Sequence, residues 1–82
     1  MIKRLDEMKE GEKGIIKSFR SDSELKIRLM GLGFIKGSEV KLKKIAPLRD
    51  PIDVKIKGYD ISLRKSEARN IEIEIINWRN FI

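Results

Sequence analysis

Histidine and cysteine are both absent from this 82-residue sequence, so carboxylates and amines are its main ionisable side chains. Without these two residue types the chain has neither the most common general base nor the usual ligands of zinc and other transition metals. A nucleophile–base pair of the Ser–His or Cys–His kind cannot be assembled. We therefore predict no catalytic residues and a protein that is not an enzyme.

Metal binding would have to depend on carboxylates alone. Two pairs lie close in the sequence, Asp22 with Glu24 and Asp50 with Asp53. The first pair is more simply explained as the acidic first turn of a helix, and the second as the solvated part of a loop. We predict no metal ligands and no cofactor, with a weak surface contact to a divalent ion as the alternative.

The sequence is basic, with 19 Lys and Arg residues against 13 Asp and Glu and a net charge of +6. Such an excess favours nucleic acid, an acidic membrane surface or an acidic protein as the partner, and the alternative is that it serves solubility alone. Outward positions on neighbouring strands predict a basic face, which a few carboxylates interrupt. Its cations are Lys41, Lys43, Lys55, Lys57 and Arg64, and its carboxylates are Glu39, Asp53 and Asp60.

Nucleic acid is less favoured as the partner than an acidic protein surface. Small barrels that bind single strands usually present exposed aromatic side chains on which bases stack. Aromatic residues make up only 6% of the chain, and Phe19 and Phe34 are expected to be buried. Tyr59 and Trp78 are the remaining candidates for stacking. A small basic nucleic-acid-binding barrel is kept as the alternative function.

One amphipathic helix is predicted over about Asp22–Leu32, where Leu25, Leu29 and Leu32 recur at helical spacing and should face the core. Ser21 and Glu24 match a capping box at its start. Gly31 and Gly33 should end it in a left-handed cap.

Ile27 and Met30 lie on another side of this helix. They are either a protein-contact patch, for which methionine is well suited, or residues that pack beneath the N-terminal lead-in or the C-terminal tail. The sequence does not decide between these interpretations.

Most of the other apolar residues alternate with charged ones, which is typical of strands with one buried face. A first strand is expected over Gly14–Arg20, where imperfect alternation indicates a bulge. Gly58-Tyr59 should join two strands in a tight hairpin, and Pro47–Pro51 should bracket a loop. The other strands are expected around Val40–Leu42, Ile52–Ile56, Ile61–Leu63 and Ile71–Ile75.

Two short segments complete the expected fold. Leu5 and Met8 form a lead-in that should cover one end of the core, and a 3₁₀ turn is expected between Arg64 and Asn70. This order predicts an all-β fold: an SH3-like five-stranded barrel with one short helix between strands 1 and 2 and the 3₁₀ turn before the last strand. The length fits a single domain over residues 1–76 with a short tail at 77–82.

Three segments carry a resemblance to a known family. They read G-E-K-G-I-I-K-S-F-R, then L-M-G-L-G-F-I-K-G-S-E-V, then A-P-L-R-D-P-I-D-V-K-I-K-G-Y-D-I-S-L-R-K-S-E-A. In this order and spacing they resemble the ferrous-iron-transport A (FeoA) family over about Leu5–Glu74. Two positions depart from the family pattern: Lys36 stands where proline is common, and Arg49 where glycine is common.

The resemblance implies a small cytoplasmic accessory or regulatory protein of ferrous-iron uptake. Its partner would be the cytosolic part of a FeoB-type membrane permease. The longest uncharged run, Leu29–Ile35, is far shorter than the roughly 18 residues that span a bilayer, which agrees with a soluble, cytoplasmic protein. A groove between the Pro47–Pro51 loop and the Gly58-Tyr59 hairpin, walled by the helix, is the expected contact. Its partner-binding residues would be Ile27, Met30, Leu48, Arg49, Lys57 and Tyr59.

Overall fold

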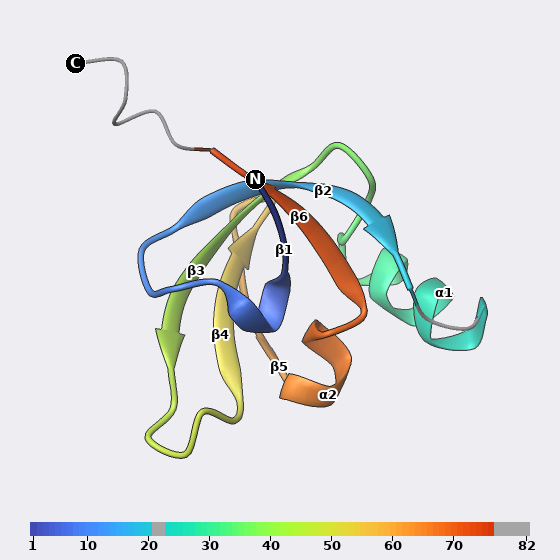
Figure 1. Cartoon of the computed structure of the whole chain (residues 1–82). Coiled ribbons are helices and arrows are strands. Elements are labelled where there is room, and N and C mark those ends of the chain that lie inside the picture. The colour runs from blue at the N-terminus through green and yellow to red at the C-terminus, as the bar shows by residue number, and fades with distance from the viewer. Residues whose placement is uncertain (21–22, 77–82) are drawn as a thin grey trace.

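The computed structural model describes residues 1–20 and 23–76, and its main feature is an antiparallel sheet that wraps around one apolar core (Figure 1). The strand order is β1-β6-β2-β3-β4-β5. In chain order the elements are β1 (Ile2–Arg4), the 3₁₀ turn η1 (Leu5–Glu7), β2 (Lys13–Phe19), α1 (Ser23–Gly31), β3 (Glu39–Ile45), β4 (Ile52–Ile56), β5 (Tyr59–Leu63), α2 (Lys65–Ala68) and β6 (Ile71–Ile75).

The described sheet has six strands, so the predicted number of five is wrong. The missed strand is β1, which pairs Ile2 with Glu74 and Arg4 with Glu72 of β6. Three residues of which only one is apolar cannot show an alternation of apolar and polar side chains. The extended conformation of β1 therefore depends on its hydrogen bonds to the edge of β6. Within the described residues no ladder joins β1 to β5, and the sheet is open rather than closed by hydrogen bonds.

Most of the predicted strands are present, with local differences. The bulge in β2 is confirmed as a register shift between Ile16 and Ser18 against β6. The tight hairpin is also present, but its turn is Lys57-Gly58 and Tyr59 is the first residue of β5. Both turn residues have positive φ, 51° and 83°, as a two-residue turn of this kind requires. The expected 3₁₀ turn after Arg64 is one turn of α-helix, α2.

Apolar side chains from every strand except β1, together with η1, α1 and α2, meet in one core. The lead-in covers this core as predicted, because Leu5 and Met8 are buried. Phe34 is fully buried, as expected, whereas Phe19 is half-buried and lies 5.9 Å below the Lys26 ammonium. None of the helices in the described part is long and apolar enough to cross a membrane.

The C-terminus of α1 closes with a Schellman motif. Gly33 has a φ of 107°, and its amide donates to the Met30 carbonyl at 3.0 Å. The Phe34 amide donates to the Leu29 carbonyl at 3.1 Å. Both Leu29 and Phe34 are fully buried, so the hydrogen bonds place two core residues at the same end of the helix. The predicted left-handed glycine cap is confirmed at Gly33.

The predicted core face of the helix is only partly right. Leu29 is fully buried and Leu25 packs against the core, but Leu32 is 41% exposed. The helix ends at Gly31, so Leu32 lies in the cap and leaves the helical stripe, and Phe34 enters the core in its stead. Some predictions depend on positions outside the described residues. These are the capping box at Ser21, the carboxylate pair Asp22–Glu24, the aromatic residue Trp78 and the tail at 77–82.

Replacing Gly14 with alanine should lower the free energy of unfolding by about 1–3 kcal/mol. A Cβ at this buried position in β2 would overlap the Cγ2 methyl of Ile73 and lie 2.8 Å from the Glu74 carbonyl oxygen. Gly31→Ala is the control: nothing lies within 4 Å of its added Cβ, and alanine favours helix by up to about 1 kcal/mol. Urea denaturation followed by circular dichroism measures both. Equal stability of the two variants would contradict the close packing of β2 on β6.

Candidate partner-binding surface

The residues that the sequence predicts to bind a partner are all exposed. Leu48 is 89% exposed, Tyr59 71% and Ile27 69%, which is unusual for large apolar side chains. Arg49 and Lys57 are exposed as well. Met30 is exposed to a smaller degree, so these residues are free to contact another molecule.

These residues do not line a single groove. The Pro47–Pro51 loop and the Lys57-Gly58 turn lie at opposite ends of β4 (Figure 1). A five-residue strand separates them by about 16 Å, at roughly 3.3 Å per residue. The expected groove between loop and hairpin is therefore wrong, and the six residues divide into two surfaces. Leu48 and Arg49 form one of them, beside the N-terminus of α2, where the Lys65 amide donates to Asp50 at 2.9 Å.

The second surface is centred on α1 and is more extensive than the sequence indicated. Leu32 and Ile35 are exposed by 41% and 39%, and they follow Ile27 and Met30 within nine residues of chain. We call this group of four residues, Ile27, Met30, Leu32 and Ile35, the α1 patch. Leu32 was missed because it was assigned to the core, and Ile35 because it lies in a loop with no periodic signal.

The hairpin turn lies next to the α1 patch. A Cβ built on Gly33, within the stretch of the patch, would lie 3.8 Å from Cδ of Lys57 and 3.9 Å from Cγ2 of Ile56. Ile56 in turn pairs with Tyr59 across the β4–β5 ladder. The structure thus places Lys57 beside Gly33, within the stretch of the patch, and the exposed Tyr59 on the other side of the same hairpin turn. Contiguous exposed apolar groups with a polar rim are typical of protein-contact sites.

The predicted basic face is present in part, and it includes Lys13 on β2, which the sequence did not single out. Lys41, Lys43 and Lys55 lie on β3 and β4 as expected. Lys57 instead lies in the hairpin turn, and Arg64 follows the end of β5.

The ladder register pairs Lys13 with Lys41 and Lys41 with Lys55, which places three lysines in one row across β2, β3 and β4. Within the described residues none of the three has a carboxylate within 4.0 Å, whereas Lys43 pairs with Asp60 at 3.0 Å. Like charges directly opposite each other destabilise a sheet, so the row is not explained by the fold.

The carboxylates considered for metal binding have local partners. Asp50 accepts a hydrogen bond from the Lys65 amide, and Asp53 accepts one from the Ser62 hydroxyl at 2.5 Å. Among the described residues there is no group of three or more side chains of the metal-binding types. Asp50 and Asp53 are therefore accounted for by loop and strand contacts.

The fold is a small antiparallel β-sheet domain with several large apolar side chains exposed on its surface. Comparison with known proteins identifies its family: the model of the FeoA domain matches residues 3–75. The chain belongs to the FeoA family.

Two relatives illustrate the range of this family. The chain is 36% identical over 72 residues to the putative Fe(2+) transport protein A of Campylobacter jejuni and covers 97% of that protein. It is 34% identical over 74 residues to an Fe(2+) transport protein A/Fe(2+) transporter FeoB fusion protein of Porphyromonas gingivalis. These matches cover 88% and 90% of this chain, but the second covers only 9% of the fusion protein.

A solved structure supports the assignment of the fold. The FeoA of Stenotrophomonas maltophilia, complexed with zinc and described as a prokaryotic SH3 domain protein, superposes with a TM-score of 0.77 at 26% identity. The match covers 88% of this chain and 89% of that structure. The predicted resemblance to the SH3 type and to FeoA is thereby confirmed, with six strands in an open sheet instead of five in a closed barrel.

Substituting Ile27 with glutamine should change the free energy of unfolding by less than about 0.5 kcal/mol, because its side chain faces solvent. Leu29→Ala, two positions along the same helix, should lower it by about 2–5 kcal/mol because it opens a cavity in the core. Chemical denaturation of both variants provides the measurement. A large loss in Ile27→Gln would instead favour packing of this residue beneath another part of the chain.

Proposed function

We propose that this chain is a non-enzymatic, cytoplasmic accessory protein of ferrous-iron uptake that binds the cytosolic part of a FeoB-type permease. Membership of the FeoA family supports a role associated with ferrous-iron transport. The Porphyromonas gingivalis relative, which joins FeoA and FeoB in one polypeptide, supports FeoB as the partner. In that fusion the two parts share one chain, so an association between them is a reasonable inference for related domains.

The α1 patch is the observation that carries the proposal. Four apolar side chains are exposed around a rigidly capped helix end, where the fold gains nothing from their exposure. Burying such groups against a partner contributes about 25 cal/mol per Å² of apolar area. Met30 adds an adaptable thioether to this surface. We therefore place the centre of the contact on Ile27 and Met30, with Tyr59 at its margin.

Charge should guide the encounter. Lys57 lies beside the α1 patch, and the lysine row on β2, β3 and β4 adds further positive charge to the sheet face. An acidic partner surface would be attracted to this face and oriented by it before the apolar groups meet. Leu48 and Arg49 lie at the far end of β4 and form a second, separate contact.

The double variant Ile27→Ser/Met30→Ser should weaken binding to the isolated cytosolic domain of a FeoB-type permease by at least about tenfold, because two apolar anchors are lost. Isothermal titration calorimetry measures the affinity. Ile2→Ser serves as a control, since Ile2 is an exposed apolar residue on β1 outside the proposed surface. Leu48→Ser should have a smaller effect than the double variant. Unchanged affinity of the double variant would refute the α1 patch as the contact.

Charge reversal should act on the association rate. Lys57→Glu is expected to slow association with the same domain, and more so at low salt, because Lys57 adjoins the patch. Arg49→Glu should have a smaller effect, since Arg49 lies at the other end of β4. Stopped-flow measurements at two ionic strengths provide the rates. Association that is insensitive to both changes at every salt concentration would exclude electrostatic steering.

Nucleic-acid binding is the second candidate, and the unpaired lysine row is the observation that favours it. Tyr59 is the one largely exposed aromatic side chain among the described residues, which is little for stacking bases. Titration with single-stranded and duplex DNA at two salt concentrations distinguishes the candidates, because binding to phosphates weakens steeply with salt.

A further inference from the structure

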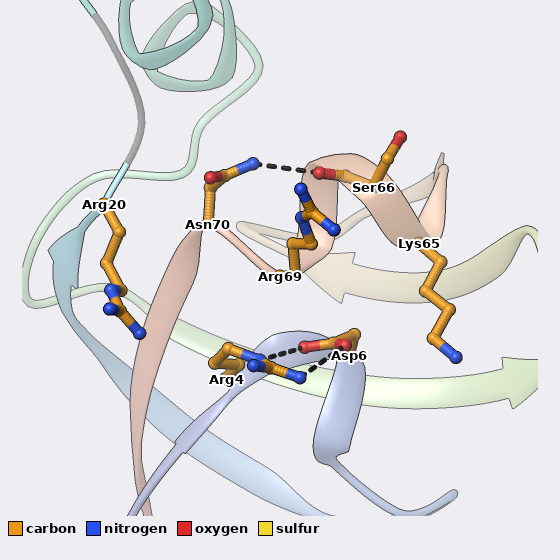
Figure 2. A pocket seen from close by; sticks show the side chains of 7 residues that line it. All are labelled: Arg4, Asp6, Arg20, Lys65, Ser66, Arg69 and Asn70. Atoms are coloured by element: carbon orange, nitrogen blue, oxygen red, sulfur yellow. Dashed lines mark hydrogen bonds and ion pairs between the residues drawn. The ribbon is translucent and has the colours of Figure 1, made fainter.

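A cleft of about 580 Å³ lies between the N-terminal segment, the residue after β2 and the helix α2 (Figure 2). None of the predicted partner-binding residues lines it. Its lining combines residues from distant parts of the sequence: Arg4, Asp6, Arg20, Lys65, Ser66, Arg69 and Asn70.

Positive charge dominates this cleft. Four of the lining residues are cations and one is a carboxylate. Lys65 and Arg69 have no carboxylate within 4.0 Å in the described part of the chain, although the Lys65 backbone amide binds Asp50. Arg20 has a single distant partner, Glu72 at 3.8 Å. Four cations around one hollow repel each other. Asp6 in the lining offsets this in part, as do Glu7 and Glu72, each 3.8 Å from Nε of Arg4 and Arg20 respectively.

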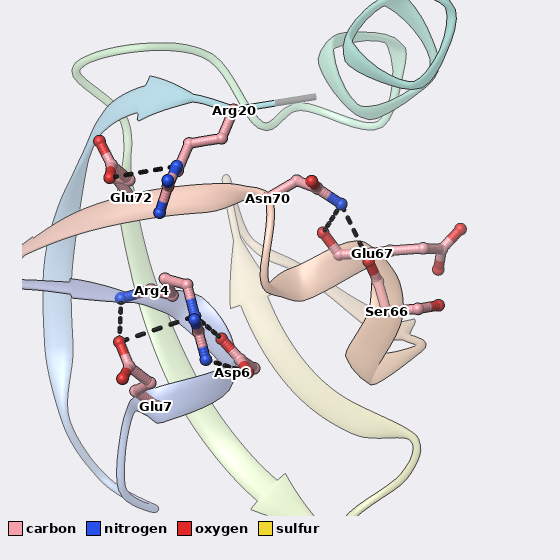
Figure 3. Close-up of polar contacts among 8 residues, drawn as sticks. All are labelled: Arg4, Asp6, Glu7, Arg20, Ser66, Glu67, Asn70 and Glu72. Carbon is pink, nitrogen blue, oxygen red and sulfur yellow. Dashed lines mark hydrogen bonds and ion pairs between the residues drawn. The ribbon is translucent and has the colours of Figure 1, made fainter. Parts of the chain in front are cut away.

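The Asp6 carboxylate fixes the orientation of Arg4. The Asp6 side chain is only 5% exposed, and it accepts hydrogen bonds from Nε of Arg4 at 3.0 Å and from a terminal nitrogen at 3.2 Å (Figure 3). These hydrogen bonds, and then the charges of Asp6 and Glu7, raise the pKa of Arg4, which keeps the guanidinium charged. The other terminal nitrogen of Arg4 has no protein partner among the described residues, so it is available to a ligand.

Hydrogen bonds also hold the opposite walls in place. The Arg20 amide donates to the Asn70 carbonyl at 2.7 Å, which ties the end of β2 to the segment after α2. The Asn70 side-chain amide donates to the Ser66 carbonyl at 2.9 Å and closes the last turn of α2 (Figure 3). The backbone of the walls and the Arg4 side chain are therefore held in place before a ligand arrives, which lowers the cost of binding.

We propose that this cleft binds the terminal phosphate or diphosphate of a small molecule. A terminal phosphate carries about −1.5 to −2 charges near neutral pH and offers three oxygens as acceptors. Cations from the N-terminal segment, the end of β2 and α2 approach the hollow from different sides, which matches several oxygens better than the two of a carboxylate. One guanidinium group can donate two parallel hydrogen bonds to two phosphate oxygens, and Lys65 adds a point charge. A hollow of this size is within the range of small-molecule sites.

The test is a titration of the whole chain with inorganic pyrophosphate, followed by backbone-amide NMR. Saturable shifts are expected at residues 4–6, 20 and 65–70. The double variant Lys65→Gln/Arg69→Gln should weaken binding at least about tenfold, because it removes the two cations without partners. Arg20→Gln, on another wall, should weaken it as well. Circular dichroism confirms that each variant is folded.

Lys36→Gln/Lys44→Gln is the matched control, since it also removes two positive charges from exposed side chains and neither lysine lines the cleft. Its affinity for pyrophosphate should stay within about twofold of the unmodified chain. Equal weakening by both double variants would show a response to net charge alone and overturn the proposal.

Two further arms identify the source of the anion. Malonate should bind more weakly than pyrophosphate. The affinity of a single-stranded oligonucleotide without terminal phosphates should be the same in Lys65→Gln/Arg69→Gln as in the unmodified chain. Malonate binding as tight as pyrophosphate would overturn the assignment to phosphate. Loss of oligonucleotide binding in Lys65→Gln/Arg69→Gln would assign the cleft to phosphodiesters instead of a terminal phosphate.

Discussion

The packing of Phe34 behind Leu29 at the end of α1 is the contact on which the arrangement of the surface depends. Gly33 turns the chain back so that Phe34 enters the core, and β3 begins five residues later. The helix therefore contributes little more than Leu25 and Leu29 to the interior. Ile27 and Met30 lie on the other side of the helix and stay exposed, and the exposure of Leu32 follows from the end of the helix at Gly31.

Much of the fold was predictable because alternation reports which face of a strand is buried. Val54 and Ile56 in β4 show this, as do Ile71 and Ile73 in β6. Strand β1 could not be predicted, since three residues with one apolar side chain carry no period, and pairing with β6 decides their conformation. Leu32 was misassigned because helical spacing says nothing about the residue at which a helix ends. Glycine spacing indicated the cap, but only the hydrogen bonds identify Gly33 as the turning point.

The candidate site was predictable residue by residue but not as a surface. Ile27 and Met30 were recognised because they lie away from the helix stripe, and their exposure agrees with one of the two interpretations left open. The relation between the loop at Arg49 and the turn at Lys57 needed the direction of β4, which separates them. Lys13 belongs to the lysine row because β2 pairs with β3 in a register that places it opposite Lys41, and the sequence alone does not give that register. The same holds for the basic cleft, whose cations come from separate segments and meet only in the folded chain.

Because the sheet is open, its exposed edge strands could pair with other copies of the chain and cause aggregation. Among the described strands β5 lies at an edge of the sheet, and its backbone between Tyr59 and Leu63 is a potential template for another strand. Two features limit this hazard: the strand is only five residues long, and Asp60 places a carboxylate on it, held by Lys43 from β3. This ion pair adds little to stability on a solvated surface, but charges on a short edge strand disfavour pairing with another chain, so we expect it to limit aggregation through strand addition.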